Sequence, residues 1–279
     1  MKFEGKLALV TGGSSGIGLA ISKQLAAQGA SVWILARDPA RLDAACREVS
    51  AHRKSPTQKI EILSADVTDG NHIAQVLGNF AQRIGPPDLL INSAGVAKPG
   101  LFQEMDLQAF RWMMDVNYFG TLNVTHALVP AMIQRRSGHI VNISSIVGFL
   151  GVYGYSAYGS AKFAVRGLSD VLRSELVEHK VHVSVVFPPD TQTPQLDYEN
   201  QFKPPLLRKL DENSKVMTAD DVARSILKGV ARRQYIITPG FDSTLFFHLS
   251  NLLGNLTYTI MDFMVASARR SLRTTQHDR

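Results

Sequence analysis

The sequence contains a single cysteine, Cys46, among its 279 residues. One thiol cannot form a disulfide within the chain, and the lack of disulfides is typical of a reducing compartment. The first five residues, MKFEG, are too short and too polar for a signal peptide, and an apolar strand pattern follows them directly. We therefore expect a cytoplasmic protein.

Linkers and basic clusters are missing as well. No Pro-, Ser- or Gly-rich stretch, low-complexity run or internal repeat divides the chain, and 45% of its residues are hydrophobic, so we expect one domain with a large core. The net charge is +6, yet no basic cluster is interleaved with aromatic residues, which argues against a nucleic-acid partner. The mild positive charge suits an anionic cofactor or an anionic membrane surface. No metal site is expected.

Apolar strand patterns alternate with helical patterns along the chain. Strands are expected over residues 6–11, 31–36, 60–65, 88–92, 139–144, 181–187 and 234–238. Helices are expected over residues 16–28, 39–50, 71–84, 107–135, 156–179 and 219–232. This alternation predicts the α/β class, with a doubly wound, parallel seven-stranded sheet of the Rossmann type.

The turn after the first strand is rich in glycine and reads TGGSSGIG over residues 11–18. Glycines here allow a tight turn, close approach of the backbone to a pyrophosphate, and close packing of helix on strand. The following helix N-terminus offers free N–H groups to phosphates. A merely tight loop is the alternative to a dinucleotide site. The residues expected to bind the cofactor here are Gly12, Ser14, Ser15, Gly16, Ile17 and Gly18.

The end of the second strand predicts which dinucleotide binds. An acidic residue there usually meets the ribose of NAD, whereas an arginine accommodates the 2′-phosphate of NADP. Arg37 directly follows the strand, while Asp38 precedes Pro39 and is interpreted as a helix N-cap. NADP(H) is therefore favoured over NAD(H), with a solvated surface charge as the alternative interpretation of Arg37.

Two further turns follow strands at the same edge of the predicted sheet. Asp66 and Val67 follow the third strand, where the carboxylate could meet the adenine amino group. Asp66 could equally hydrogen-bond its own backbone in a turn. Asn92, Ala94 and Gly95 follow the fourth strand, where small residues leave room for a cofactor.

Tyr158 and Lys162 stand four residues apart, which places them on one face of the predicted helix. A nearby ammonium stabilises a phenolate and lowers the pKa of the phenol, so Tyr158 could exchange a proton with a carbonyl or an alcohol. Ser145 follows an apolar strand, at the edge where open α/β sheets bind ligands. The alternative is a surface Tyr and Lys on an ordinary amphipathic helix.

These motifs, together with Asn117 inside the long helix, resemble those of the short-chain dehydrogenase/reductases in order and spacing over about residues 6–240. The resemblance implies catalysis by Asn117, Ser145, Tyr158 and Lys162. In that family pattern Tyr158 is the acid/base and Lys162 also binds the nicotinamide ribose. Ser145 would hold the carbonyl oxygen and Asn117 a proton-relay water. The resemblance further implies cofactor contacts from Pro188, Thr191 and Thr193, and a homodimer or homotetramer.

The sequence FPPDTQTP over residues 187–194, with EN at 199–200 and KP at 203–204, is similar to the 3-ketodihydrosphingosine reductases. Those enzymes use NADPH to reduce the 3-keto group of a long-chain amino alcohol in sphingolipid synthesis. Two departures from the wider family are Ser93, where many members have asparagine, and Pro189, where many have glycine. The alternatives are reduction of another lipid-like ketone, such as a 3-ketoacyl thioester, and a non-catalytic NADP(H)-binding sensor.

The stretch from about residue 190 to 218 is rich in proline and charge, has little periodicity, and is predicted to be a substrate lid. Asp190 and Glu199 within it are candidates to meet a substrate ammonium, or else are solvated loop carboxylates. This lid completes the predicted domain, residues 1–240.

Residues 241–279 form an apolar helical extension with a basic tail that includes Arg269, Arg270 and Arg279. Over residues 243–266 a narrow polar stripe interrupts an otherwise apolar helix, which argues against a simple membrane span. The helix could lie in a membrane interface, with its arginines near lipid phosphates. It could equally be buried in an oligomer contact or cover the substrate cleft.

Overall fold

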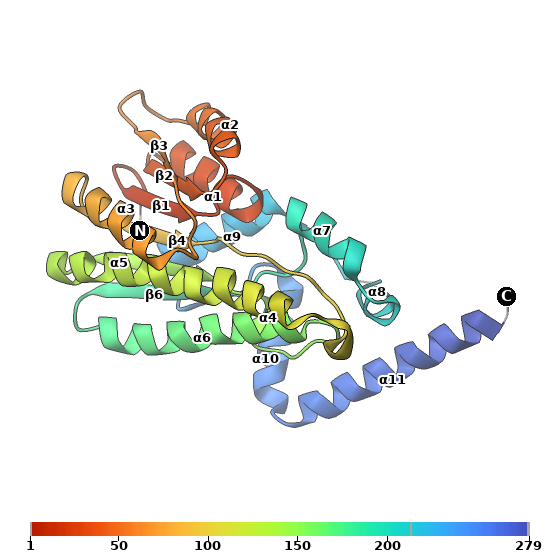
Figure 1. The fold of residues 1–279 in the computed structure, drawn as a ribbon. Coiled ribbons are helices and arrows are strands. Elements are labelled where there is room, and N and C mark those ends of the chain that lie inside the picture. Colours follow the sequence, from red (N-terminus) through yellow and green to blue (C-terminus); the bar gives the residue numbers. More distant parts are fainter. Residues whose placement is uncertain (1, 213, 278–279) are drawn as a thin grey trace.

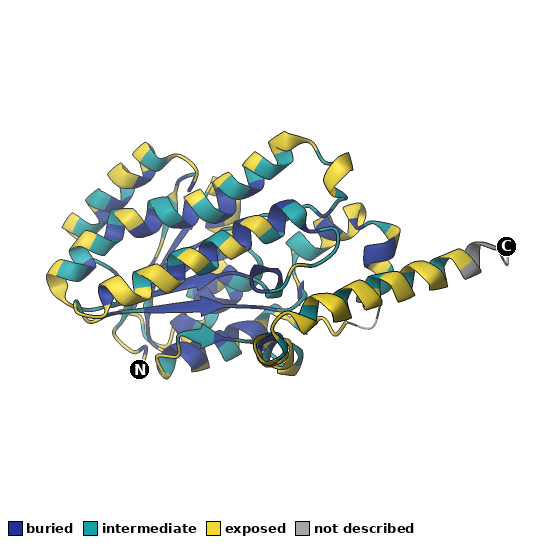
Figure 2. Ribbon diagram, turned by 90° about the horizontal axis from the view of Figure 1, so that it is seen from below, coloured by how far each residue is buried: buried dark blue, intermediate teal, exposed yellow. Residues whose placement is uncertain are grey.

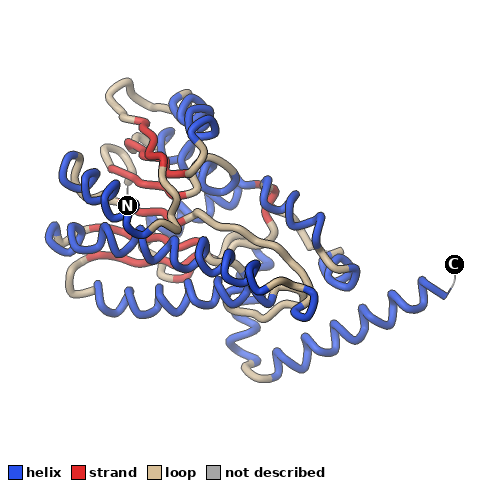
Figure 3. The backbone as a smooth tube through the Cα atoms, viewed as in Figure 1, coloured by secondary structure: helices blue, strands red, loops and turns tan. Residues whose placement is uncertain are grey.

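The computed structural model describes residues 2–212 and 214–277, and seven of its strands form one parallel sheet (Figures 1 and 3). The strand order is β3-β2-β1-β4-β5-β6-β9. These strands are β1 (Leu7–Thr11), β2 (Ser31–Ala36), β3 (Ile60–Ser64), β4 (Leu89–Asn92), β5 (Gly138–Ile143), β6 (Val181–Val186) and β9 (Ile236–Ile237). The predicted doubly wound α/β fold is confirmed.

Helices cover both faces of the sheet, and Figure 2 shows the buried sheet between them. One apolar core lies between the sheet and α1 (Gly16–Ala27), α2 (Pro39–Ser50) and α9 (Ala219–Ala231). A second core lies between the other face and α3 (Gly70–Arg83), α5 (Gly120–Arg135) and α6 (Ser156–Leu176). Strands buried on both faces are apolar throughout, which is why the sequence pattern predicted them.

The direction of winding changes between the neighbouring strands β1 and β4. From β1 the chain moves outward to β3, and it then returns to β4 and moves outward in the other direction to β9. The loops that leave β1 and β4 therefore diverge toward opposite faces of the sheet. A crevice for a ligand forms at such a point, at the carboxyl ends of the strands.

The predicted helix over residues 107–135 is continuous, but its hydrogen bonding changes halfway. α4 (Leu107–Met114) passes into a π-helical turn, η2 (Asp115–Phe119), and then into α5. Asn117 lies within this turn. Single π turns are rare and occur frequently at functional sites.

The predicted lid contains regular structure that the sequence did not reveal. β7 (Thr191–Gln192) pairs with β8 (Met217–Thr218), and α7 (Pro194–Phe202) and α8 (Pro205–Asp211) lie between them. With 9 and 7 residues, these helices have too few turns to show an apolar period. Residue 213 of the lid lies outside the described residues. Short 3-10 helices complete the fold at η1 (Phe102–Glu104) and η3 (Ile146–Gly148).

The C-terminal extension is two helices, so the single helix expected over residues 243–266 is wrong. α10 (Phe241–Leu253) ends at Gly254, whose φ of 51° and ψ of −124° are strongly unfavourable for other residues, and α11 (Leu256–His277) begins in a new direction. In Figure 1, α11 runs away from the sheet and passes α8. Arg279 of the predicted basic tail lies outside the described residues. Across residues 2–212 and 214–277, no helix is long and apolar enough to cross a membrane.

Candidate active site

Tyr158 and Lys162 lie on the first turns of α6, and both side chains are buried. Lys162 Nζ donates a 2.9 Å hydrogen bond to the carbonyl oxygen of Ile143, at the end of β5, and lies 5.5 Å from the centroid of the Tyr158 ring. Ser145, just beyond β5, hydrogen-bonds through its side chain to the Tyr158 phenol. The structure therefore brings these three predicted residues together at the carboxyl end of the sheet.

The pKa values in this cluster depend mainly on burial. Burial and the negative charge of Glu199 raise the pKa of the Tyr158 phenol, despite hydrogen bonds from Ser145 and Gln195. Burial lowers the pKa of the Lys162 ammonium to about 8. Burial is the largest influence on the Tyr158 pKa, and the Lys162 ammonium is directed at a backbone carbonyl. The expected lowering of the Tyr158 pKa by Lys162 therefore stays a prediction.

Asn117 is fully buried in the π turn, and among the described residues its side chain hydrogen-bonds only to backbone groups. Its Oδ1 accepts from the Val96 N–H at 3.1 Å, and its Nδ2 donates to the carbonyl oxygens of Val96 and Met113, both at 2.8 Å. A Cβ at Gly95 would lie 2.9 Å from Asn117 Oδ1 and 3.5 Å from Lys162 Nζ. Asn117 thus lies beside the Tyr158–Lys162 pair, while its water-holding role stays a prediction.

The glycine-rich turn packs too closely for larger residues. Gly12 has a φ of +63°, and a Cβ there would lie 2.8 Å from the Ala94 backbone. A Cβ at Gly18 would lie 2.4 Å from the Gly12 carbonyl oxygen. Within the described residues, Ser15 makes no side-chain cap at the start of α1, so first-turn N–H groups are available to an anion. This bare turn fits the pyrophosphate of a dinucleotide.

The residues at the end of β4 and directly after it are held by hydrogen bonds to other parts of the protein. Thr11 Oγ1 accepts hydrogen bonds from the N–H groups of Ser93 and Ala94, both at 3.1 Å, and so joins the two turns. Asn92 is buried, and its Nδ2 donates to Thr125 Oγ1 and to Asn142 Oδ1, both at 2.9 Å. The side-chain nitrogen of Asn92 is therefore used within the protein, and its predicted cofactor contact stays a prediction.

Arg37 and Asp66 lie side by side at the ends of β2 and β3, with 3.5 Å between guanidinium and carboxylate. Asp66 accepts hydrogen bonds from the N–H (2.9 Å) and Oγ1 (2.8 Å) of Thr68, so the alternative of a turn residue is confirmed. Burial would raise the pKa of Asp66, but these bonds and Arg37 lower it. Val67 is buried and packs against Gly120. Contacts of Asp66 and Val67 with an adenine stay predictions.

The start of the lid reaches the glycine-rich turn. A Cβ at Gly16 would lie 3.1 Å from Thr193 Cγ2, although the two residues are far apart in the sequence. Thr193 Oγ1 caps α7, and Thr191 Oγ1 donates a 2.8 Å bond to the Pro189 carbonyl oxygen. Pro188 accepts a hydrogen bond from the Ile146 N–H at 3.3 Å, beside the candidate catalytic residues. The predicted lid therefore borders both halves of the site.

Beside Tyr158 the lid places a buried carboxylate, Glu199. Tyr155 Oη donates to its Oε2 at 3.0 Å, and Gln195 Nε2 donates to its Oε1 at 2.9 Å. Neither donor was among the residues predicted from the sequence. The signal for Tyr155 was its place three residues before Tyr158, on one helical face, whereas Gln195 carried no signal because only the fold of the lid brings it to Tyr158.

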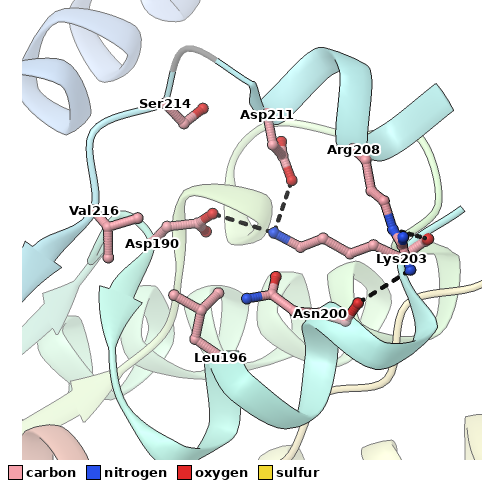
Figure 4. A pocket seen from close by; sticks show the side chains of 8 residues that line it. All are labelled: Asp190, Leu196, Asn200, Lys203, Arg208, Asp211, Ser214 and Val216. Carbon is pink, nitrogen blue, oxygen red and sulfur yellow. Dashed lines mark hydrogen bonds and ion pairs between the residues drawn. The ribbon is translucent and has the colours of Figure 1, made fainter. Parts of the chain in front are cut away.

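The second predicted ammonium ligand, Asp190, is engaged in an ion pair. Lys203 Nζ lies 3.4 Å from Asp190 and 2.9 Å from Asp211, between the loop after β6 and the end of α8 (Figure 4). Burial opposes the charge of Lys203, but the two carboxylates outweigh it and raise the pKa of the ammonium. The cavity at these residues has a volume of about 210 Å³. Its remaining lining residues are Leu196, Asn200, Arg208, Ser214 and Val216.

Comparison with known proteins agrees with this geometry. The short chain dehydrogenase family model matches residues 6–204. The mouse 3-ketodihydrosphingosine reductase is 37% identical over 235 residues, 84% of this chain and 71% of the relative. The Dictyostelium discoideum 3-ketodihydrosphingosine reductase is 36% identical, over 95% of this chain and 84% of the relative.

Solved structures show the same fold. A short-chain dehydrogenase from Streptomyces avermitilis has a TM-score of 0.76 at 30% identity, covering 91% of this chain and 96% of that one. A short-chain dehydrogenase from Sphingobium yanoikuyae in complex with NADPH has a TM-score of 0.75 at 27% identity, covering 90% and 96%. The chain belongs to the short-chain dehydrogenase family. As a member it is an oxidoreductase that uses a nicotinamide cofactor, and its likeness to the 3-ketodihydrosphingosine reductases is confirmed.

Proposed function

We propose that the protein reduces the 3-keto group of a long-chain sphingoid base, as in 3-ketodihydrosphingosine, with NADPH. The observation that carries this proposal is the cluster of Ser145, Tyr158 and Lys162 beside the buried Glu199. Over most of its length the chain is also more than a third identical to 3-ketodihydrosphingosine reductases. Residues 1–240 would form the catalytic domain, and residues 190–218 its lid.

The residues of the cluster divide the chemistry between them. When bound, NADPH supplies the hydride. The Tyr158 hydroxyl donates its proton to the ketone oxygen, which the Ser145 hydroxyl also holds. Lys162 stabilises the phenolate that remains, because its ammonium is held on the same helical face, and it contacts the nicotinamide ribose. Asn117 holds a water through which the site regains its proton.

Arg37 is proposed to select NADPH over NADH. The guanidinium stands at the end of β2, largely exposed and oriented by Asp66, where a 2′-phosphate would form charge-assisted hydrogen bonds with it. The glycine-rich turn and the N-terminus of α1 would hold the pyrophosphate. Pro188, Thr191 and Thr193 would border the nicotinamide half of the cofactor.

A substrate panel with NADPH tests the proposed function. We expect 3-ketodihydrosphingosine to be reduced with the highest kcat/KM, and 3-ketoacyl thioesters and steroid ketones at least about tenfold less well, as suits a site with a buried carboxylate. The product is identified by mass spectrometry. A preference for the thioesters would support the alternative reductase, and NADPH binding without turnover of any ketone would support a sensor.

We also propose that α10 and α11 rest on an anionic lipid surface. Three arginines follow the apolar part of α11, and each basic residue near such a surface contributes about 1 kcal/mol. Because α11 passes α8, this surface lies beside the lid. The exposed apolar side chains of the two helices are Phe241, Leu245, Phe246, Leu249, Leu252, Leu256, Tyr258, Ile260, Phe263 and Met264.

Co-sedimentation with vesicles tests the lipid contact. The protein should bind vesicles containing phosphatidylglycerol more tightly than vesicles of phosphatidylcholine alone. Leu252→Asp with Phe263→Asp should abolish binding, whereas Val177→Asp on the exposed end of α6 should not. An intact protein that ignores both vesicles, and whose dimer or tetramer dissociates in the double variant, would show that the helices form an oligomer contact instead.

A further inference from the structure

Glu199 is an unusual residue for the interior of a lid. Its side chain lies on α7, only 7% of its surface is exposed, and both of its carboxylate oxygens accept hydrogen bonds from uncharged groups, Tyr155 and Gln195. Within residues 2–212 and 214–277 no basic side chain forms an ion pair with it; the nearby Lys203 pairs with Asp190 and Asp211. Burial raises the pKa of Glu199, although its two hydrogen-bond donors and the charge of Lys203 oppose the rise.

A buried carboxylate without a cation in direct contact is costly for stability. An apolar side chain of similar volume commonly stabilises a protein interior at least as well as buried charged groups do. A carboxylate also has about four positions that accept hydrogen bonds. Tyr155 and Gln195 occupy two of them, so Glu199 retains the capacity to accept further donors, and its negative charge favours a cationic one.

Glu199 lies close to the proposed proton donor. Gln195 donates to Glu199, and both residues influence the pKa of the Tyr158 phenol, Gln195 by lowering it as a hydrogen-bond donor and Glu199 by raising it through its charge. The centroids of the Tyr155 and Tyr158 rings lie 5.9 Å apart, and the Tyr155 hydroxyl donates to Glu199. A cation held by Glu199 would therefore lie near a carbonyl group held by Tyr158.

We infer that Glu199, held by Tyr155 and Gln195, is the specificity site for an ammonium group on the carbon next to the ketone. This inference rests on the proposed function, because it assumes that the carbonyl oxygen of the substrate is held at Tyr158. The site accepts 2-amino-3-ketones and disfavours ketones that lack the amine. With such ketones the carboxylate stays buried without a cation in direct contact. The ammonium charge also opposes the effect by which Glu199 raises the pKa of Tyr158.

The test compares two ketones that differ in one group: 3-ketodihydrosphingosine and the same molecule with hydrogen in place of its amine. In the wild type, kcat/KM should be about 10- to 100-fold higher for the amine, the range expected for a hydrogen-bonded ion pair. Glu199→Gln should bring this ratio to about 1, because the amide keeps the shape of the side chain and removes its negative charge. Asp197→Asn, on the exposed side of the same helix, should keep the wild-type ratio.

A binding measurement separates this site from the proposed function. Calorimetry of the NADPH complex should show dodecylamine binding about tenfold more tightly than dodecanol, and Glu199→Gln should remove the difference. If the wild type reduces both ketones equally well, or if Glu199→Gln impairs both to the same degree, the ammonium site is wrong while the reductase stands. If neither ketone is reduced, the proposed function fails, and equal binding of amine and alcohol would then overturn the ammonium site as well.

Discussion

The two halves of the candidate active site are built by different means. On the cofactor side, the turns at residues 11–18 and 92–95 are backbone and small side chains in contact, so that even one added Cβ at Gly18 meets a carbonyl oxygen at 2.4 Å. On the substrate side, α7 and the residue that follows it provide buried charged groups, Glu199 and Lys203, held by side-chain partners. The first half suits a ligand that many enzymes share, and the second suits one particular substrate.

The largest expected effect falls on the residue where the halves meet. Tyr158→Phe should lower kcat at least about 100-fold, because general acid–base catalysis contributes about 10²–10⁴-fold. NADPH affinity should stay within about threefold, since the phenol donates to the ketone and not to the phosphates. Single-turnover kinetics and calorimetry measure the two quantities. Near-normal turnover in this variant would show that Tyr158 is not the proton donor. The division of the site into a cofactor half and a substrate half that meet at Tyr158 would then fail as well.

The next effect isolates the cofactor half. Gly18→Ala should weaken NADPH binding about 10- to 100-fold, because relieving a 2.4 Å contact with backbone costs about 1–3 kcal/mol. Gly78→Ala is the matched control, since it lies inside α3 with nothing within 4 Å of the added Cβ. That variant should bind NADPH normally and be stabilised by up to about 1 kcal/mol. Equal cofactor affinity in both variants would contradict the close-packed turn.

A third variant isolates the substrate half. Lys203→Met leaves Asp190 and Asp211 facing each other, which should cost about 1–2 kcal/mol, less than for a fully buried pair because both carboxylates reach water. Hydrogen exchange of the α7–α8 amides should become about tenfold faster and KM should rise, with NADPH affinity unchanged. Lys209→Met, which removes a more exposed pair with Glu212, should change neither. Faster exchange throughout the sheet would show that the lid is not a separate unit.

The smallest effect concerns the preference between cofactors. Arg37→Ala should weaken NADPH about 3- to 10-fold and leave NADH nearly unchanged, because an exposed guanidinium contributes about 1 kcal/mol to binding a phosphate. Arg47→Ala, on the exposed side of α2, serves as the control. Equal losses for the two cofactors, or a wild type that prefers NADH, would count against Arg37 as the selecting residue.

The difference between the two halves of the site also explains which features could be predicted from the sequence and which could not. The alternation of strands and helices, the glycine-rich turn, and the Tyr158–Lys162 spacing all predicted their structures. Lys162 was expected to stabilise the phenolate, yet it donates to the Ile143 carbonyl, and burial sets the direction of both pKa shifts. The helices of the lid and the end of α10 at Gly254 were missed, although the glycine itself was a visible stop signal.

The sequence by itself determined the doubly wound sheet and the edge where the chemistry occurs, because strand and helix periods and turn residues act over a few neighbouring positions. Tertiary structure alone decided that Tyr155 and Gln195 meet Glu199 and that Thr193 lies on Gly16. Those contacts join segments whose approach depends on how two short helices fold back over the sheet. The pKa of a carboxylate depends on how much solvation it loses and on the groups that surround it. Neither can be predicted from the adjacent residues in the sequence.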